Sequence, residues 1–351
     1  MIKLAATLSL AGLLAAGGYL YADKLGIDLG KLGKTVAPAV AAATPAAPAV
    51  DWIAAAPGRV EPKSGEIRIG TALLGRVAEV LVKVDDRVEE GELLFRLDDE
   101  EPRARLAAAE AEALARRKEK EGDLPSSRED VRKAEDAVFA AERAVTGARF
   151  ELDFMHAAKR QGTGSDGAVA EAKKRLVEAR DRLKKDRLAF VKAQSKSGLP
   201  APNRAEAAIS AARAEVAVAE ALLEKTRIRA SAEGTVLQLN VKAGEMVAPS
   251  PENPLVVMGD MSVVRVKAEV DEGDIAKIKA GQKAYVRTAG YAGKDFEGRV
   301  TAIAPTLGAP RIGPRGPRRQ NDVDVLEVTI EMQPNGKLMP GMRVDTFFRT
   351  E

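Results

Sequence analysis

The chain has 351 residues, of which 45% are hydrophobic, 30% are charged and only 4% are aromatic. So few aromatic residues argue against one large globular core and favour slender helices and small β-modules. The 55 basic and 52 acidic residues are interleaved, which excludes the clustered basic surface that nucleic-acid binding needs. The chain has no cysteine and a single histidine, so disulfides, thiolate nucleophiles and cysteine-bound metals are excluded as well.

Residues 1–23 are predicted to be a transmembrane signal anchor. Residues 4–22 are almost wholly apolar, and as a helix they would span about 28 Å, close to the thickness of the bilayer hydrocarbon. Lysines flank this stretch, and Tyr19 and Tyr21 suit its interfacial end. A cleaved signal peptide is the alternative, although bulky residues occupy the place of its cleavage site. Residues 24–51 follow as a tether rich in proline and alanine.

Two stretches, 71–99 and 227–260, share one pattern of strands and turns. Apolar residues alternate over short runs that are separated by turn residues, which is typical of β-hairpins. Equivalent positions lie 159 residues apart, so the chain contains an internal repeat. Asp85 stands where the second copy has a glycine, and we expect the turn to survive because aspartate tolerates left-handed backbone angles. The glycines that mark these strands and turns are Gly75, Gly91, Gly234 and Gly244.

Between the two copies, residues 100–226 change from a period of two to a period of seven. Such spacing predicts an antiparallel coiled-coil hairpin. The loop 162–167 holds three glycines within six residues and is the expected tip, with Ser165 or Asp166 capping the return helix. Breaks near 123–127 and 198–203 are almost equally far from this tip, so we expect two hairpin segments stacked end to end. The spaced rows are Val131, Val138, Val145 and Leu152, then Val169, Leu176, Leu183 and Phe190, then Ile209, Val216 and Leu223.

Residues 52–70 and 261–351 are predicted to form a small β-barrel. Alternating apolar residues from Val264 to Val270, a helical turn at Asp274–Lys279 and two later strands indicate this fold. The loop 307–321 interrupts it with three prolines, three glycines and four arginines. An ordinary surface loop is one interpretation, and a basic lip that faces anionic lipid or a transporter is the other. Its arginines are Arg311, Arg315, Arg318 and Arg319.

The two repeated β-stretches resemble the halves of a lipoyl or biotinyl carrier domain. In such a carrier the halves are contiguous, and a modified lysine lies at the turn that joins them. Here the turn would fall at residues 98–102, where no lysine is present and the helical hairpin is inserted instead. The resemblance therefore implies a lipoyl-like fold without covalent carriage, and no cofactor is expected.

The order of anchor, tether, barrel strand, lipoyl half, hairpin, lipoyl half and barrel resembles the haemolysin-secretion-type membrane fusion proteins, or periplasmic adaptor proteins. The resemblance covers residues 56–349. It implies an elongated α+β fold with no catalytic or metal site. It also implies a subunit, commonly hexameric, that is anchored in the inner membrane with its bulk in the periplasm. Its expected partners are an inner-membrane transporter, the inner membrane itself and an outer-membrane channel of the TolC type.

The same resemblance suggests where partners bind. Family tips often carry arginine, leucine, glycine and serine; Gly162 and Ser165 match this pattern, whereas Phe154 and Ala158 stand in place of the first two. Gln238 is the candidate for a gate in a lipoyl ring, with an exposed strand residue as the plain alternative. The expected docking tip comprises Gly162, Gly164, Ser165 and Asp166.

The sequence is compatible with more than one class of inner-membrane transporter as the partner. The phrase Gly58–Glu66, the broken hairpin and the absence of a further β-domain after the barrel favour an ATP-driven (ABC) exporter over a proton-driven (RND or MFS) pump. A structural coiled-coil spacer is a further alternative, though it would not explain the paired lipoyl halves. An enzyme is disfavoured because the acidic residues lie on solvated helix faces, and we expect His156 to be a surface imidazole near the tip.

Overall fold

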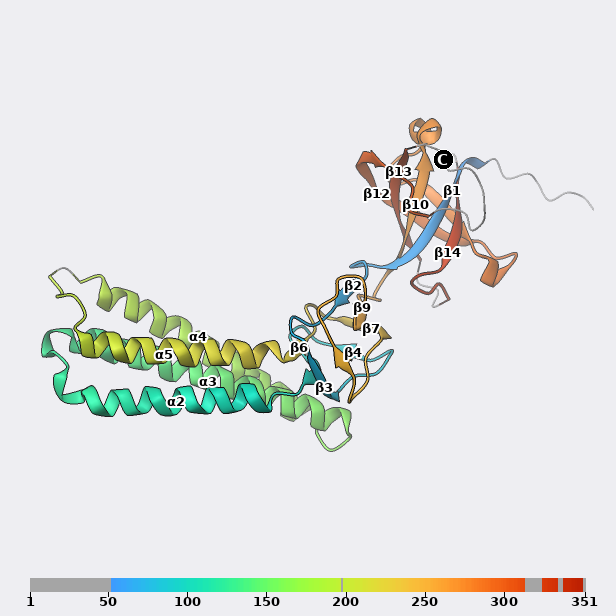
Figure 1. The fold of residues 1–351 in the computed structure, drawn as a ribbon. Helices are drawn as coiled ribbons and strands as arrows, with labels where there is room; N and C mark the ends of the chain where they lie inside the picture. Colours follow the sequence, from blue (N-terminus) through green and yellow to red (C-terminus); the bar gives the residue numbers. More distant parts are fainter. Residues whose placement is uncertain (1–51, 197, 313–323, 334–336, 350–351) are drawn as a thin grey trace, which may run out of the picture. The chain divides into compact units, whose positions relative to one another are not determined.

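The computed structural model describes residues 52–196, 198–312, 324–333 and 337–349 (Figure 1). The predicted anchor and tether, residues 1–51, lie outside the described residues. Within the described ranges no helix is both long and apolar enough to cross a membrane. The described chain folds into a barrel, a lipoyl-like domain and a helical region that is inserted between the two halves of the lipoyl-like domain.

Six antiparallel strands close into the barrel in the order β1-β10-β13-β12-β11-β14. Alternate residues point inward, so a strand such as β13 buries every second side chain. The core is apolar, with Val60, Ile330 and Phe348 fully buried. A 3₁₀ helix, η4 (Glu272–Lys277), replaces the α-helical turn predicted two residues later. The strands are β1 (Trp52–Pro62), β10 (Val264–Asp271), β11 (Lys283–Arg287), β12 (Phe296–Gly308), β13 (Val325–Met332) and β14 (Arg343–Arg349), with η5 (Ala289–Tyr291) after β11.

The lipoyl-like domain consists of two four-stranded sheets, β2-β9-β7-β4 and β6-β5-β3-β8. Each sheet takes strands from both sequence repeats, so neither half forms a sheet alone. Phe95 and Met258, one from each half, are fully buried in the shared core. The strands are β2 (Ile67–Ile69), β3 (Gly75–Val80), β4 (Arg87–Val88), β5 (Leu93–Leu97), β6 (Arg227–Arg229), β7 (Gly234–Leu239), β8 (Met246–Val247) and β9 (Val256–Gly259).

One boundary differs from the sequence-based expectation. Strand β2 was expected within the barrel segment 52–70, yet it pairs with β9 in the lipoyl-like domain. The connection between β1 and β2 turns at Gly65, whose φ is +75°, and this turn directs β2 away from the barrel strands. The first lipoyl-like half therefore includes β2 and begins several residues before position 71.

Four helices, rich in the strong helix formers alanine, glutamate, arginine and lysine, make up the helical region. They pair as predicted, α2 with α5 and α3 with α4. The predicted row Ile209, Val216 and Leu223 of α5 is buried, as are Ala212 and Ala219 between its members. The helices are α2 (Glu100–Lys120), α3 (Glu129–Arg160), α4 (Asp166–Gln194) and α5 (Arg204–Lys225), with η2 (Glu121–Asp123) and η3 (Ser126–Arg128) between α2 and α3.

The two helix pairs lie side by side, so the predicted end-to-end stacking is wrong (Figure 1). Arg117 of α2 donates two 2.7 Å hydrogen bonds to Asp136 of α3, and Arg149 of α3 lies 3.0 Å from Glu224 of α5. The chain reverses completely at both breaks. Pro125 interrupts the helix between α2 and α3, and Gly198, with φ of +78°, interrupts it between α4 and α5. The breaks are adjacent, as their equal distance from the loop predicted.

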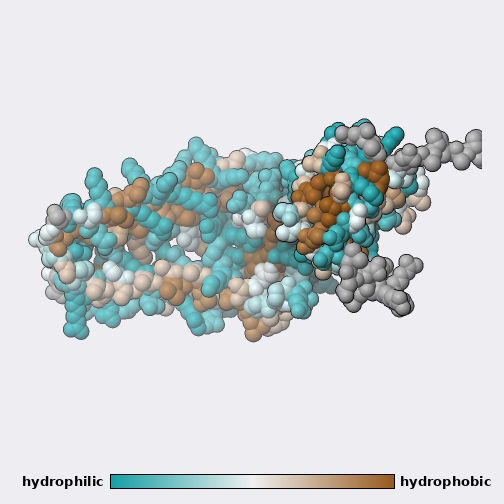
Figure 2. Space-filling model, turned by 90° about the horizontal axis from the view of Figure 1, so that it is seen from above, coloured by the Kyte–Doolittle hydropathy of each residue, from teal (hydrophilic) through white to brown (hydrophobic). Residues whose placement is uncertain are grey.

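The surface of the helical region is mostly charged. Figure 2 shows hydrophilic side chains along its edges, with smaller apolar patches between them. The exposed large apolar residues of the helices include Leu114, Phe154, Val177, Leu188, Val191 and Val218.

Candidate functional site

The glycine loop joins α3 to α4 in a tight turn. Gly162 has φ of +78°, which glycine adopts without strain, and the next two residues both donate backbone hydrogen bonds to the carbonyl of Ala158. Ser165 caps α4 by accepting a 3.2 Å hydrogen bond from Ala168 N, and Asp166 begins the helix. A Cβ at Gly164 would lie 2.7 Å from the backbone nitrogen of the helix end, so the turn has no space for a side chain there.

This loop lies beside the first lipoyl-like half, and not at the far end of the helical region where the sequence led us to expect it. Arg160, two residues before Gly162, inserts its guanidinium between two carboxylates. Its Nη1 lies 2.7 Å from Asp86 Oδ2, and its Nη2 lies 2.6 Å from Glu92 Oε1. On the other side of the loop, Lys173 of α4 lies 2.8 Å from Glu89. Both helices of the pair are thus tied to the lipoyl-like domain.

Asp86, Glu89 and Glu92, which we call the acidic patch, are held in place by their own turn. Asp86 Oδ2 also accepts a 2.8 Å hydrogen bond from Lys83 N, and Glu92 Oε2 accepts one of 2.9 Å from Glu89 N. The hydrogen bond from Lys173 lowers the pKa of Glu89 below its ordinary value, against the effect of burial. The same bond raises the pKa of Lys173. The patch is therefore a preformed receptor for cationic side chains.

His156 also faces the acidic patch. Its Nδ1 lies 3.5 Å from Glu92 Oε1, and its side chain is only 11% exposed. The expectation of a surface imidazole is therefore wrong, because α3 packs against the lipoyl-like domain at this point. Among the described residues, no group of three or more histidine, aspartate or glutamate side chains is arranged to hold a metal ion.

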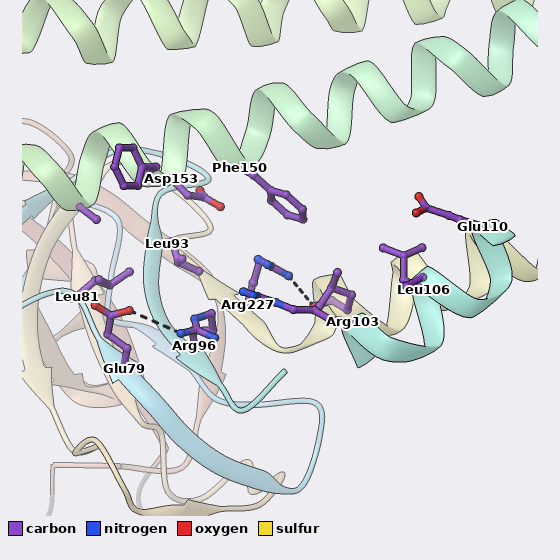
Figure 3. Close-up of a pocket in the computed structure, with 14 residues that line it drawn as sticks. Glu79, Leu81, Leu93, Arg96, Arg103, Leu106, Glu110, Phe150, Asp153 and Arg227 are labelled. Carbon is purple, nitrogen blue, oxygen red and sulfur yellow. Dashed lines mark hydrogen bonds and ion pairs between the residues drawn. The ribbon is translucent and has the colours of Figure 1, made fainter. Parts of the chain in front are cut away.

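A cleft of about 530 Å³ lies between α2, the end of α3 and strands β5 and β6 (Figure 3). Its apolar wall includes Leu93 and Phe150, and the ring of Phe150 lies 4.2 Å from the guanidinium carbon of Arg227. Arg96, which also lines the cleft, donates a 2.7 Å hydrogen bond to the buried Asp99. The other labelled lining residues are Glu79, Leu81, Arg103, Leu106, Glu110 and Asp153.

Sequence reasoning missed a second contact face on α3. Apart from its predicted heptad rows, α3 carries a stripe that includes Phe139, Thr146, Asp153 and Arg160, spaced by seven. Phe139 packs on the core between α2 and α5, and Thr146 donates to Glu220 of α5. A helix with two such stripes is in contact on two sides, so this spacing was the available signal of the fold-back.

Arg229 connects this stripe to the lipoyl-like domain. It donates hydrogen bonds of 2.6 and 2.8 Å to the two carboxylate oxygens of Asp153, and one of 2.7 Å to Glu224. Burial desolvates the guanidinium, but its two carboxylate partners outweigh this cost and raise the pKa of Arg229 above its ordinary value. Arg229 in β6 thus joins α3 and α5 at the base of the helical region.

The remaining predicted site residues lie on the two β-domains. Gln238 is exposed on β7. Gly91 and Gly244 have φ near +80° and +86°, whereas Gly75 and Gly234 begin strands. Arg311 is exposed, and its backbone N–H donates a 2.8 Å hydrogen bond to the buried carboxylate of Glu269. The predicted loop arginines Arg315, Arg318 and Arg319 lie outside the described residues.

Comparison with known proteins finds relatives that are similar to this chain. The profile of the CusB-like β-barrel domain matches residues 264–310, which include β10, η4, β11, η5 and all of β12. The multidrug resistance protein MdtN of Escherichia coli K12 is 27% identical over 234 residues, or 65% of this chain and 66% of MdtN. The macrolide export protein MacA of Escherichia coli O157:H7 is 24% identical over 275 residues, or 78% of this chain and 62% of MacA. In sequence and in the order of its domains, the chain is similar to the membrane fusion protein family.

Members of this family, also called periplasmic adaptor proteins, act as adaptors and not as enzymes. The crystal structure of MacA from Actinobacillus actinomycetemcomitans aligns with 84% of this chain and 78% of its own chain, at 20% identity and a TM-score of 0.46. The chain spans slightly less than two thirds of the length of the curated relatives MdtN and MacA.

Proposed function

We propose that this adaptor links an inner-membrane exporter to an outer-membrane channel for efflux or secretion. The observation that supports this proposal best is the architecture: interleaved lipoyl-like halves with helical pairs inserted between them, next to a closed six-stranded barrel. The relatives MdtN and MacA are named for multidrug resistance and macrolide export. An adaptor of this kind acts by binding its partners and holding them in position, so no covalent chemistry is required.

The proposed inner-membrane partner is an ATP-driven (ABC) exporter, and a proton-driven (RND or MFS) pump is the alternative. The support comes from the sequence phrase Gly58–Glu66, which covers the end of β1 and the turn before β2. The chain would be held in the inner membrane by residues 1–23, with its bulk in the periplasm. Stimulation of ATP hydrolysis by a co-purified permease complex would favour the first class, and dependence on a proton gradient would favour the second.

We further propose that the adaptor assembles into a ring, with six copies as the expected number. In such a ring the lipoyl-like domains would stack side by side, and the exposed Gln238 would be available to line a central opening. A glutamine offers both donors and acceptors at such a position. Size measurement of the assembled protein tests the copy number, and a Gln238→Ala variant tests the gate by its effect on leakage through the assembled complex.

Two loops are the proposed contacts with partners. The glycine loop, with Gly162, Gly164, Ser165 and Asp166, would bind an outer-membrane channel of the TolC type. The basic loop around Arg311 would face the transporter or anionic lipid headgroups, where each cation gains from the negative surface potential.

Photocrosslinking in cells tests these contacts. A photoreactive residue at Ser165 should capture an outer-membrane channel, and one at Arg311 should capture an inner-membrane protein. Lys184, which is exposed in the middle of α4, is the matched control and should capture neither. If position 165 captures no outer-membrane protein and deletion of the gene leaves export unchanged, the chain is a structural spacer and the proposed function is wrong.

A further inference from the structure

The helices α3 and α4 form a unit with its own internal contacts. They pack along each other, and α4 buries Val169, Ala172 and Leu176. Ion pairs cross between them: Arg175 lies 2.6 Å from Glu151, and Arg187 lies 2.9 Å from Glu142. The glycine loop closes the pair at one end. These contacts do not depend on the rest of the molecule, so α3 and α4 can stay together wherever the pair lies.

The contacts of this pair with α2 and α5 have a different chemistry. They are mostly charged, and Phe139 is the α3 residue that packs into the small apolar cluster between α2 and α5. Most of these charges keep partial contact with solvent, and solvated ion pairs stabilise an interface only weakly. The charged contacts are Asp136 with Arg117 and Arg213, Glu135 with Arg213, Arg143 with Glu110 and Glu220, Arg149 with Glu224, and Arg132 with Glu206.

At the lipoyl-like domain the pair is again held by charge. Arg160 and Lys173, one from each helix, bind the acidic patch, and His156 faces it. Asp153 binds Arg229 of β6. Because α3 has 32 residues and α2 has 21, α3 extends about 16 Å further and so reaches alongside the lipoyl-like domain.

Both chain crossings between the pair and the rest of the molecule lie at one place. Arg128 of η3 lies 2.8 Å from Glu206 of α5, and it also donates a 2.8 Å hydrogen bond to the carbonyl of Pro200. Proline or glycine interrupts the helix at each crossing, at Pro125 and at Gly198. Two breaks that meet at a single point have the geometry of a hinge.

We propose that residues 129–194 form a movable arm, which rests on the acidic patch and swings outward about these two crossings. Outward movement breaks the charged contacts, opens the 530 Å³ cleft beside Phe150 and carries the glycine loop away from the lipoyl-like domain. Ser165, which is exposed at rest, is then carried toward a distant partner. Movement of the arm can be measured in the purified protein without any partner, so this inference does not rest on the proposed function.

Ionic strength should control the position of the arm. Salt screens partly solvated charges, whereas it does not weaken apolar contacts. Raising salt therefore destabilises the contacts of the arm with the acidic patch and with α5, while the apolar face between α3 and α4 persists. The resting position is favoured at low salt, and the outward position gains population as salt rises.

A distance measurement tests this directly, because the chain has no cysteine of its own. Spin labels are placed at Glu90→Cys, next to the acidic patch, and Gln161→Cys, at the end of α3; both native residues are exposed. Between about 0.05 M and 1 M NaCl, we expect a second population that is longer by more than about 20 Å. A control pair within the arm, Ala144→Cys with Arg180→Cys, should keep one distance throughout.

Charge reversal provides the matched test at low salt. Lys173→Glu should raise the outward population about two- to fivefold, the effect of losing one solvated ion pair. The double variant Lys173→Glu with Glu89→Lys should restore the resting population, because the pair is rebuilt with exchanged signs. If the Glu90–Gln161 distance stays single and short at all salt concentrations, in Lys173→Glu and in Arg160→Glu, while circular dichroism shows folded helices, the arm is fixed and the inference is overturned.

The same cysteine pair links the arm to transport. A short bismaleimide that joins positions 90 and 161 holds the arm at rest, and we expect export to fall at least about tenfold relative to either single cysteine with the same reagent. Undiminished export by the crosslinked protein would show that the arm works in its resting position and would overturn its proposed opening. Failure of the proposed function is distinguishable, because in that case export is independent of the whole adaptor.

Discussion

Asp85 and Gly244 occupy the same turn position in the two lipoyl-like halves. Asp85 is the only residue other than glycine with a positive φ in the described chain, at +74°, and its counterpart in the second half, Gly244, has +86°. The Asp85 N–H donates a 2.8 Å hydrogen bond to the carbonyl of Val236, so the turn connects the two halves. Aspartate tolerates this conformation at a modest cost, which glycine does not incur.

Substitution at Asp85 should therefore change stability in a direction set by backbone preference. We expect Asp85→Gly to be neutral or to stabilise the fold by up to about 1 kcal/mol, and Asp85→Val to destabilise it by about 1–2 kcal/mol. Urea unfolding followed by circular dichroism measures both. An Asp85→Val variant as stable as the original chain would show that the turn readily adopts another conformation.

Gly147 is a glycine whose position in the structure does not require glycine. It lies in the middle of α3, is exposed, and a Cβ there would meet no atom within 4 Å. We expect Gly147→Ala to stabilise the helical region by about 0.5–1 kcal/mol, because alanine loses less backbone entropy in a helix. Gly164→Ala is the matched contrast and should destabilise, since its Cβ would lie 2.7 Å from Lys159 N. Thermal unfolding of the two variants should shift in opposite directions.

At the scale of elements, Glu206 is the residue that fixes the joint between the helix pairs. Its buried carboxylate binds Arg128 and Arg132 and completes the capping box of α5 with Asn203. One side chain thus connects η3, the start of α3 and the start of α5. The reversal of the chain at both breaks depends on this arrangement as well as on the helix-breaking residues.

Removal of this carboxylate should be costly. We expect Glu206→Ala to destabilise the helical region by about 3 kcal/mol, because Arg128 would remain buried without its charged partner and α5 would lose its cap. Glu129→Ala, which removes an exposed ion pair with Lys133, should change stability by less than about 0.5 kcal/mol. Hydrogen exchange of α3 and α5 measures both, and equal effects would contradict the role of Glu206.

At the scale of the whole molecule, acidification should release the arm. The pKa of Glu89 is lowered by Lys173, and His156 and Lys159 also face it. A carboxylate with a lowered pKa stabilises the resting state at pH values above its ordinary pKa of 4.5. This contribution is lost as the pH falls through the lowered pKa. The raised pKa of Lys173 keeps that partner charged up to about 10.5, so the pair is intact between these limits.

The Glu90–Gln161 distance should therefore lengthen below pH 4.5 and remain short near neutrality. Glu89→Gln should show the longer population at neutral pH and less change on acidification. The comparison with Glu89→Gln isolates the share of this residue. Identical pH profiles for the two proteins would exclude Glu89 from the response.

The sequence by itself determined the local structure and the order of domains. Period-two and period-seven patterns marked the strands and helices, the repeat around Gly75 and Gly234 revealed paired halves, and Gly162 with Ser165 identified a helix stop and a cap. These features depend on neighbouring residues, whose backbone preferences and side-chain periodicity are visible in the chain.

Only the tertiary structure decided how the helix pairs lie. The helix breaks at Pro125 and Gly198 are compatible with either a straight rod or a full reversal, because a break removes helical hydrogen bonds without setting the new direction. The choice depends on contacts between residues far apart in the chain, such as Arg160 with Asp86 and Asp153 with Arg229. Pairing of charges across such distances leaves no local periodic signal, so the resting place of the arm appears only when the chain is folded.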